Sequence, residues 1–207
     1  MWSIIQVDMK AYIIRHAEKE KGDYYNPQLR HQDEPISARG REQAEKLCAY
    51  FADKPVSAIL VSGYLRTAQT AACLAQQLNI GPVVDERLNE IDNGLIEGMS
   101  DAAIQDRYPD VWRAYLARSA DFRFPGGETG EKARGRGASL LEEKRREGRD
   151  IVMVCHEGLI RLLACHVLGL PVHDRWNFHV DYCGIMEIAY QEGHDRWKLI
   201  RFNQACW

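Results

Sequence analysis

Short apolar runs alternate with longer amphipathic segments along most of the chain. Residues 11–15, 57–61 and 151–155 form largely apolar runs of strand length, and residues 82–84 form a shorter one. Such runs are typical of strands buried on both faces, as in parallel sheets. The alternation predicts an α/β fold, a three-layer sandwich with a mostly parallel central sheet flanked by helices.

Amphipathic segments between these runs predict helices. Ser37 is suited to cap a helix with Ala44, Leu47 and Phe51 on one face. A second helix is expected after Ser62. Further helices are expected over residues 101–120, 127–146 and 157–168.

The last part of the chain predicts two more strands. They are expected over residues 182–190 and 197–202, joined by a turn at residues 191–193. Two turn-rich stretches, residues 22–35 and 121–127, remain as long loops. Loops that project from strand ends often shape a pocket, so we expect these two to do so.

Length and charge limit the class of protein. A chain of 207 residues with 45% hydrophobic residues can bury one sizeable core, so we expect one domain. The net charge of -3 provides no overall attraction to nucleic acid or to an anionic membrane. We therefore expect neither as a partner.

Cysteine usage and the first residues bear on the compartment. The six cysteines are scattered, without the paired spacing of metal ligands, so reduced thiols are expected. Residues 1–10 lack the basic start and apolar stretch of a secretory signal, and no window nears the ~18 apolar residues of a membrane span. These features predict a soluble, cytoplasmic protein.

Charged and nucleophilic side chains stand where predicted strands end. Arg15 and His16 follow the first long apolar run, Arg66 lies just after the second, and His156 follows the third. The carboxyl ends of parallel strands meet at one sheet edge, where α/β proteins bind ligands. A neutral imidazole at this edge could accept a phosphoryl group, and the arginines could hold its oxygens.

Six segments extend this pattern in order along the chain. They are Arg15-His16-Ala17-Glu18; Pro35-Ile36-Ser37 with Gly40 and Gln43-Ala44; Ser62 through Arg66 to Gln69-Thr70-Ala71; Leu88-Asn89-Glu90 with Gly94 and Glu97-Gly98; Pro125-Gly126-Gly127-Glu128; and Val154-Cys155-His156-Glu157-Gly158. With these segments the chain resembles the histidine phosphatase superfamily, which includes cofactor-dependent phosphoglycerate mutases and many phosphomonoesterases. The resemblance implies a phosphoglycerate mutase-like fold over residues 1–207, with residues 1–8 as an N-terminal extension. Thr67 departs from the alanine that this family commonly has.

The resemblance also implies a role for each matched side chain. His16 would be the nucleophile that forms a phosphohistidine, while Arg15, Arg66 and His156 would bind the phosphoryl oxygens of the substrate. Glu90 matches the proton donor, which must hold a proton that it can give to the leaving oxygen. The positive charges of Arg15, Arg66 and His156 would replace a metal ion, so no metal or other cofactor is expected. The implied function is hydrolysis of a small phosphomonoester.

Other functions remain open from the sequence. A phosphoglycerate mutase needs basic residues for a second acidic ligand, but Ile91, Asp92 and Asn93 follow Glu90 here, which favours a phosphatase. A phosphatase acting on phosphohistidine in proteins fits the start of the pattern at residues 15–19, but such enzymes tend to be shorter and to lack the segment around Glu90, so it ranks below a small-molecule phosphatase. A non-catalytic phosphate-binding module is disfavoured because all five matched polar positions are present.

Several further residues have two open interpretations. Glu18 and Glu157 either orient an arginine or face solvent. The pocket walls are expected from residues 22–35 and 93–125. Five side chains there either contact substrate or pack beneath a lid: Tyr24, Tyr25, Trp112, Tyr115 and Arg123. Five histidines match no motif and are expected outside the site: His31, His166, His173, His179 and His194. Substrate identity and oligomeric state stay open.

Overall fold

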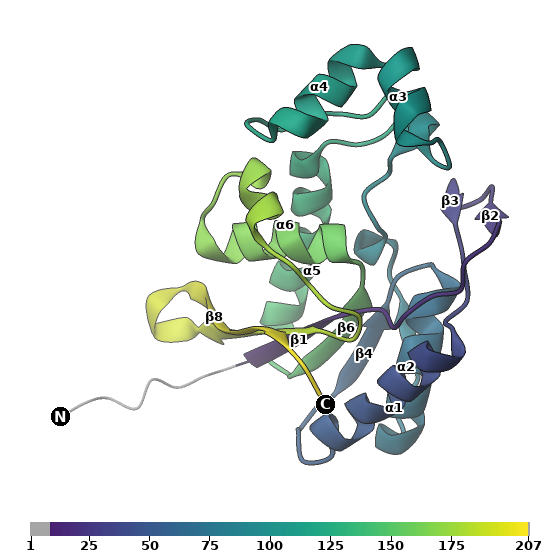
Figure 1. Ribbon diagram of the computed structural model, residues 1–207. Helices are drawn as coiled ribbons and strands as arrows, with labels where there is room; N and C mark the ends of the chain where they lie inside the picture. Colours follow the sequence, from purple (N-terminus) through teal and green to yellow (C-terminus); the bar gives the residue numbers. More distant parts are fainter. Residues whose placement is uncertain (1–8, 207) are drawn as a thin grey trace.

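A six-stranded sheet forms the centre of the computed structural model, which describes residues 9–206 (Figure 1). The strand order is β5-β4-β6-β1-β7-β8. The strands are β1 Met9–Arg15, β4 Ala58–Val61, β5 Val83–Val84, β6 Ile151–Cys155, β7 Ile185–Gln191 and β8 Arg196–Gln204. β5, β4, β6 and β1 are parallel, whereas β7 and β8 add antiparallel strands at one side. The predicted α/β class with a mostly parallel sheet is confirmed.

The register of the three central strands brings their carboxyl ends together. Val154 of β6 pairs with Ile14 of β1 on one side and with Val61 of β4 on the other. The next residues along these strands therefore leave the sheet at the same edge. This edge carries the polar side chains that the sequence places after each strand.

The two faces of the sheet are covered by different helices. Tyr12 and Ile14 pack with residues of α1 (Ala38–Phe51) and α2 (Leu65–Leu78). Ala11 and Ile13, which point the other way, pack with α5 (Gly130–Glu147) and α6 (Glu157–Leu168). Side chains of a strand alternate between its faces, so one apolar strand contributes to both cores. The result is the expected three-layer sandwich.

The predicted helix over residues 101–120 is wrong as a single element. The chain forms α3 (Asp101–Arg107) and α4 (Pro109–Ala117), with Tyr108 between them at φ -135° and ψ 59°. Pro109 has no N–H to donate and its ring disfavours a helical conformation in the preceding residue. The α3–α4 pair lies away from the sheet, at the top of Figure 1.

The helix predicted over residues 127–146 begins later than expected. The Thr129 hydroxyl accepts a hydrogen bond from Lys132 N and caps α5, which starts at Gly130. Gly126 and Gly127 precede it in a turn, with Gly126 at φ +71°. A Cβ on Gly127 would lie 2.2 Å from the Asp92 carbonyl oxygen, so the turn packs against the loop that follows Glu90.

Other boundaries also differ from the prediction. Residues 182–184 precede β7 as a turn, and the loop over residues 22–35 contains a hairpin of β2 (Tyr25–Asn26) and β3 (His31–Gln32) that was not predicted. Four short 3-10 helices complete the described chain: η1 Glu86–Leu88, η2 Gly94–Ile96, η3 Val172–Asn177 and η4 Glu192–His194. The expectation of an extension over residues 1–8 lies outside the described residues. Within residues 9–206, each helix is too short or too polar to cross a bilayer.

Candidate active site

A cavity of about 200 Å³ opens at the edge where β1, β4 and β6 end, and we call it the strand-end cavity. Four of the five residues predicted for the site line it: Arg15, His16, Arg66 and Glu90. The fifth, His156, is completely buried beside them, with its ring centroid 5.2 Å from that of His16. The structure therefore brings all five side chains into one cluster.

His16 is held as a neutral imidazole with a defined tautomer. Its Nδ1 lies 2.8 Å from the carbonyl oxygen of Ala17, and a carbonyl only accepts, so Nδ1 carries the hydrogen. Burial, followed by the positive charge of Arg66, holds the pKa of His16 well below its ordinary value. Nε2 consequently keeps its lone pair, which is the requirement for a nucleophile.

The two arginines keep unused hydrogen-bond donors in the interior. Arg15 contacts Glu157 at 3.0 Å and stacks over the Tyr182 ring at 4.2 Å. Arg66 donates to the Gln32 carbonyl at 2.9 Å. The Nε atoms of both arginines are buried without a partner among residues 9–206. A buried donor without an acceptor is costly, so each guanidinium group, which lines the strand-end cavity, would gain by turning this donor to an anion that enters it.

A chain of hydroxyl groups fixes the tautomer of His156. Arg66 Nη2 lies 3.3 Å from His156 Nδ1, and a guanidinium only donates, so Nδ1 accepts. His156 Nε2 then donates to Ser62 Oγ at 2.8 Å. Ser62 donates in turn to Thr67 Oγ1 at 2.9 Å, and Thr67 donates to the Tyr64 carbonyl at 2.7 Å. Thr67, the departure from the family pattern, thus leaves Ser62 free to accept from His156.

Glu90 is anchored at the start of α6. One carboxyl oxygen accepts from Ile91 N at 2.9 Å and Leu159 N at 3.2 Å, and the other accepts from Gly158 N at 3.2 Å. A Cβ at residue 158 would lie 2.6 Å from Glu90 Oε1, so a side chain at this position would displace the Glu90 carboxyl group. The carboxyl group is therefore fixed at the boundary of the strand-end cavity.

The two glutamates with open interpretations differ in their contacts. Glu157 bridges Arg15 and Arg161, so it orients an arginine of the site. Glu18 accepts a hydrogen bond from the Ser37 hydroxyl at 3.0 Å, at the start of α1. It lies 3.8 Å from the exposed Arg39 and supports the loop after β1 instead.

Five residues that the sequence analysis did not assign also line the strand-end cavity. They are Lys19, His31, Gln32, Asn93 and Glu97. Lys19 lies three residues after the proposed nucleophile, a spacing that could have suggested it. Glu97 lies in a matched segment. His31 and Gln32 come from the unpredicted β2–β3 hairpin, whose position depends on distant residues.

The prediction that His31 lies outside the site is wrong. Its Nδ1 lies 3.0 Å from Glu97 Oε2, and the side chain is buried. Burial is the largest single influence and would raise the pKa of Glu97, but the hydrogen bond and charge of His31, together with hydrogen bonds from Gln32 N and Asn93, outweigh it and lower the pKa to about 2. Nε2 of His31 has no partner among the described residues. The ionised Glu97 thus holds a third imidazole at the cavity.

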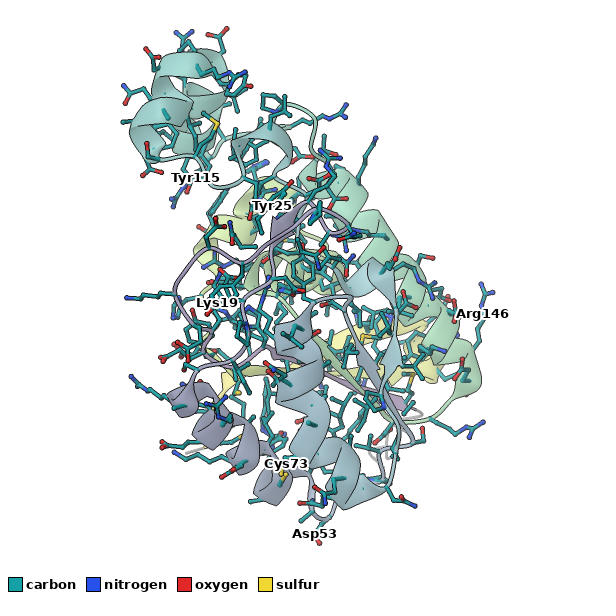
Figure 2. The ribbon with its side chains drawn as sticks, turned by 90° about the vertical axis from the view of Figure 1, so that its right-hand side faces the viewer. Lys19, Tyr25, Asp53, Cys73, Tyr115 and Arg146 are labelled. Carbon is teal, nitrogen blue, oxygen red and sulfur yellow. The ribbon has the colours of Figure 1, made fainter. Side chains whose placement is uncertain are left out.

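A second cavity of about 350 Å³ adjoins the first and shares Glu90, Asn93 and Glu157 with it. Of the residues predicted to contact substrate, Trp112 and Tyr115 line this second cavity. The others are elsewhere: Tyr24 and Tyr25 are exposed, and Arg123 donates to the Gly127 carbonyl at 2.7 Å. Figure 2 shows Tyr115 at the base of the α3–α4 pair, near the body of the protein.

The buried histidines predict that stability falls on acidification. Burial is the main cause that lowers the pKa of both His16 and His156, so the folded protein resists protonation that the unfolded chain accepts at about pH 6.5. Below that pH the unfolded state binds more protons. Each histidine then lowers the free energy of unfolding by up to about 1.4 kcal/mol per pH unit, an effect absent above pH 6.5.

Urea unfolding between pH 7.5 and 5.5 measures this dependence. In His16→Asn, the free energy of unfolding is expected to depend less steeply on pH, by the contribution of roughly one proton. The control His194→Asn, at an exposed site, is expected to show the wild-type dependence. Equal slopes in wild type and His16→Asn would contradict a neutral buried His16.

Comparisons with known proteins agree with this geometry. A family model described as the histidine phosphatase superfamily (branch 1) matches residues 11–205. Phosphoserine phosphatase 1 of Hydrogenobacter thermophilus is 29% identical over 203 residues, covering 96% of this chain and 93% of the relative. A protein named as a probable phosphoglycerate mutase of Enterobacter sp. (strain 638) is 29% identical over 190 residues, covering 89% of this chain and 86% of the relative.

Solved structures show the same fold. Mycobacterial glucosyl-3-phosphoglycerate phosphatase superimposes with a TM-score of 0.80 at 25% identity, covering 95% of this chain and 99% of that one. The family model spans almost all of the described residues, including every side chain of the cluster at the strand ends. The chain therefore belongs to branch 1 of the histidine phosphatase superfamily.

Proposed function

We propose that this protein hydrolyses small phosphomonoesters through a phosphohistidine on His16. One observation carries the proposal: a neutral imidazole, held in one tautomer by the Ala17 carbonyl, stands beside two arginines that each keep a buried donor unused. A nucleophile with a lone pair and an unfilled set of cationic donors is what transfer of a phosphoryl group requires.

The first step breaks the ester bond. His16 Nε2 attacks phosphorus in line and forms an N–P bond as the P–O bond to the leaving group breaks. Glu90 gives its proton to the leaving oxygen, which departs as an alcohol. Arg15 and Arg66 bind the non-bridging oxygens. His156 Nδ1 accepts from Arg66 Nη2. His156 joins the two arginines once Arg66 turns this donor to a phosphoryl oxygen and Nδ1 takes up a proton from water, which the negative charge of the bound group favours.

The second step restores the enzyme. Glu90, now a carboxylate, accepts a proton from a water molecule that attacks phosphorus. The N–P bond breaks and inorganic phosphate leaves with His16 neutral again. Lys19, Arg15 and Arg66 supply the positive charge of the strand-end cavity, so the proposal includes no metal ion. Activity is expected to be unaffected by a chelator such as EDTA.

The charges near Glu90 favour water over a second phosphorylated acceptor. Glu97 and Glu157 line the strand-end cavity beside Glu90, and Asp92 follows Glu90 by two residues in the sequence. Carboxylates in these places would repel an acidic second ligand. The phosphoserine phosphatase relative supports the same choice.

The six cysteines are free thiols, which fits the reducing cytoplasm as the proposed location.

Two assays on the same preparation test hydrolysis against isomerisation. We expect inorganic phosphate to be released from a panel of small monoesters, including phosphoserine, and little conversion of 3-phosphoglycerate to 2-phosphoglycerate. Efficient isomerisation with little hydrolysis would identify a mutase instead. Stoichiometric binding of phosphate without turnover of any ester would identify a binding module.

A further inference from the structure

The second cavity, which adjoins the strand-end cavity, is walled by aromatic rings. We call it the aromatic cavity and define it by Trp112, Tyr115, Phe122, Phe124 and Trp176. The rings support one another, because the Tyr115 ring lies 5.4 Å from the ring centroids of both Trp112 and Trp176. Its volume of about 350 Å³ lies in the range of clefts that bury a small organic ligand.

The aromatic cavity is placed to receive the group that leaves with the ester oxygen. It shares Glu90, the proposed proton donor, with the strand-end cavity. An ester bound with its phosphoryl group near His16 would therefore direct its organic part past Glu90 toward the rings. Aromatic walls favour a planar ring in that part of the substrate, through stacked and edge contacts.

The charges of the aromatic cavity disfavour an anionic group. Both guanidinium groups in the wall have acidic partners: Arg161 pairs with Glu157, and Arg175 lies 3.4 Å from Asp121. Other carboxyl groups, among them Asp101, line the same space. A second carboxylate or phosphate on the leaving group would meet more negative than positive charge.

Two unused donors add a polar requirement. Trp176 Nε1 and Arg161 Nε are buried without a partner among residues 9–206, and both side chains line the aromatic cavity. Both atoms are covered by protein, so a ligand with acceptor atoms on its ring would satisfy them once the side chains turn these donors toward the cavity, whereas a purely aliphatic chain could not satisfy them.

We propose that the substrates are phosphate monoesters whose alcohol carries an uncharged aromatic ring with hydrogen-bond acceptors. This proposal rests on the proposed hydrolysis. Phosphomonoesters of small anionic alcohols are poor substrates by the same reasoning. The α3–α4 pair and η3, which supply Trp112, Tyr115 and Trp176, thereby set specificity, while the strand ends supply the chemistry.

Substrates with similar leaving groups test this proposal. We expect kcat/KM to be about 10-fold higher for 2-phenylethyl phosphate than for 2-cyclohexylethyl phosphate or ethyl phosphate. The value for 3-phosphoglycerate, whose leaving group is anionic, is expected to be no higher than for ethyl phosphate. Equal values for the aromatic and cyclohexyl esters, or a preference for this anionic ester, would overturn the proposal.

Variants in the cavity wall give a second measurement. Trp112→Leu is expected to lower kcat/KM for the phenyl ester about 3- to 10-fold more than it lowers kcat/KM for ethyl phosphate. Tyr25→Leu, which removes an exposed ring outside the aromatic cavity, is the matched control and should keep the preference. Trp176→Phe retains a ring but loses the Nε1 donor. It should lower kcat/KM for 2-(3-pyridyl)ethyl phosphate several-fold more than for the phenyl ester.

Binding of phosphonates separates this proposal from the proposed function. Titration calorimetry is expected to show tighter binding of 2-phenylethylphosphonate than of ethylphosphonate, and Trp112→Leu should remove the difference. If no ester is hydrolysed but the binding difference persists, the proposed hydrolysis fails and the aromatic preference stands. If esters are hydrolysed without a binding difference, the aromatic preference fails alone.

Discussion

His16→Ala is expected to lower kcat for phosphomonoester hydrolysis by at least about 10⁴-fold, because the proposed reaction has no route to phosphate without a nucleophile. The effect is expected in kcat more than in substrate affinity, since Arg15 and Arg66 remain to bind the phosphoryl group. Release of inorganic phosphate measures the rate.

Trapping the intermediate makes the test specific to His16. A rapid quench of wild type with ³²P-labelled substrate should give a phosphoprotein whose label survives alkali and is lost in acid, as an N–P bond requires. His16→Ala should carry no such label. The control His194→Ala changes a histidine in η4, outside the strand-end cavity, and should retain both label and activity. Hydrolysis by His16→Ala at the wild-type rate would show that His16 is not the nucleophile.

Glu90→Gln is expected to slow hydrolysis of alkyl phosphates by about 10²- to 10³-fold, since an amide cannot give a proton to a poor leaving group. The amide oxygen can still accept from Ile91 N and Leu159 N, while the bond to Gly158 N is lost. A thermal melt close to that of wild type would show that the loop keeps its position.

The leaving group separates the two proton transfers assigned to Glu90. The p-nitrophenolate group leaves without protonation, so the first turnover of p-nitrophenyl phosphate by Glu90→Gln should remain fast. The following turnovers should be slow, because no base activates water, and phosphoprotein should accumulate as a burst. Glu86→Gln, at an exposed position in η1, should behave as wild type. Equal slowing of both substrates in the first turnover would contradict Glu90 as the acid.

Much of the scaffold follows from local sequence patterns. The runs that become β1, β4 and β6 are apolar on both faces, and their alternating side chains predict a sheet covered by helices on each side. Residues at the ends of parallel strands meet without further information, because parallel pairing aligns those ends. This is why His16, Arg66 and His156 could be expected at one edge before any contact was known. Glu90, by contrast, was assigned from the resemblance alone.

Only the tertiary structure decides how these groups are held and what surrounds them. The tautomers of His16 and His156 depend on contacts that no pattern shows, including the link from Ser62 to Thr67. His31 enters the site because Gln32 N donates to Glu97 across the cavity, a bond between residues far apart in the chain.

Two aromatic residues also differ in a way that only the tertiary structure shows. Tyr25 and Tyr115 both come from segments that were predicted to surround a pocket, but one is exposed and the other lines the aromatic cavity. Hydrophobic periodicity determines the faces of strands and helices, because each face is set by neighbours a few residues away. Tyr25 lies in β2 and Tyr115 in α4, outside the central sheet, and the positions of these segments follow from long-range contacts that form only when the whole chain is folded.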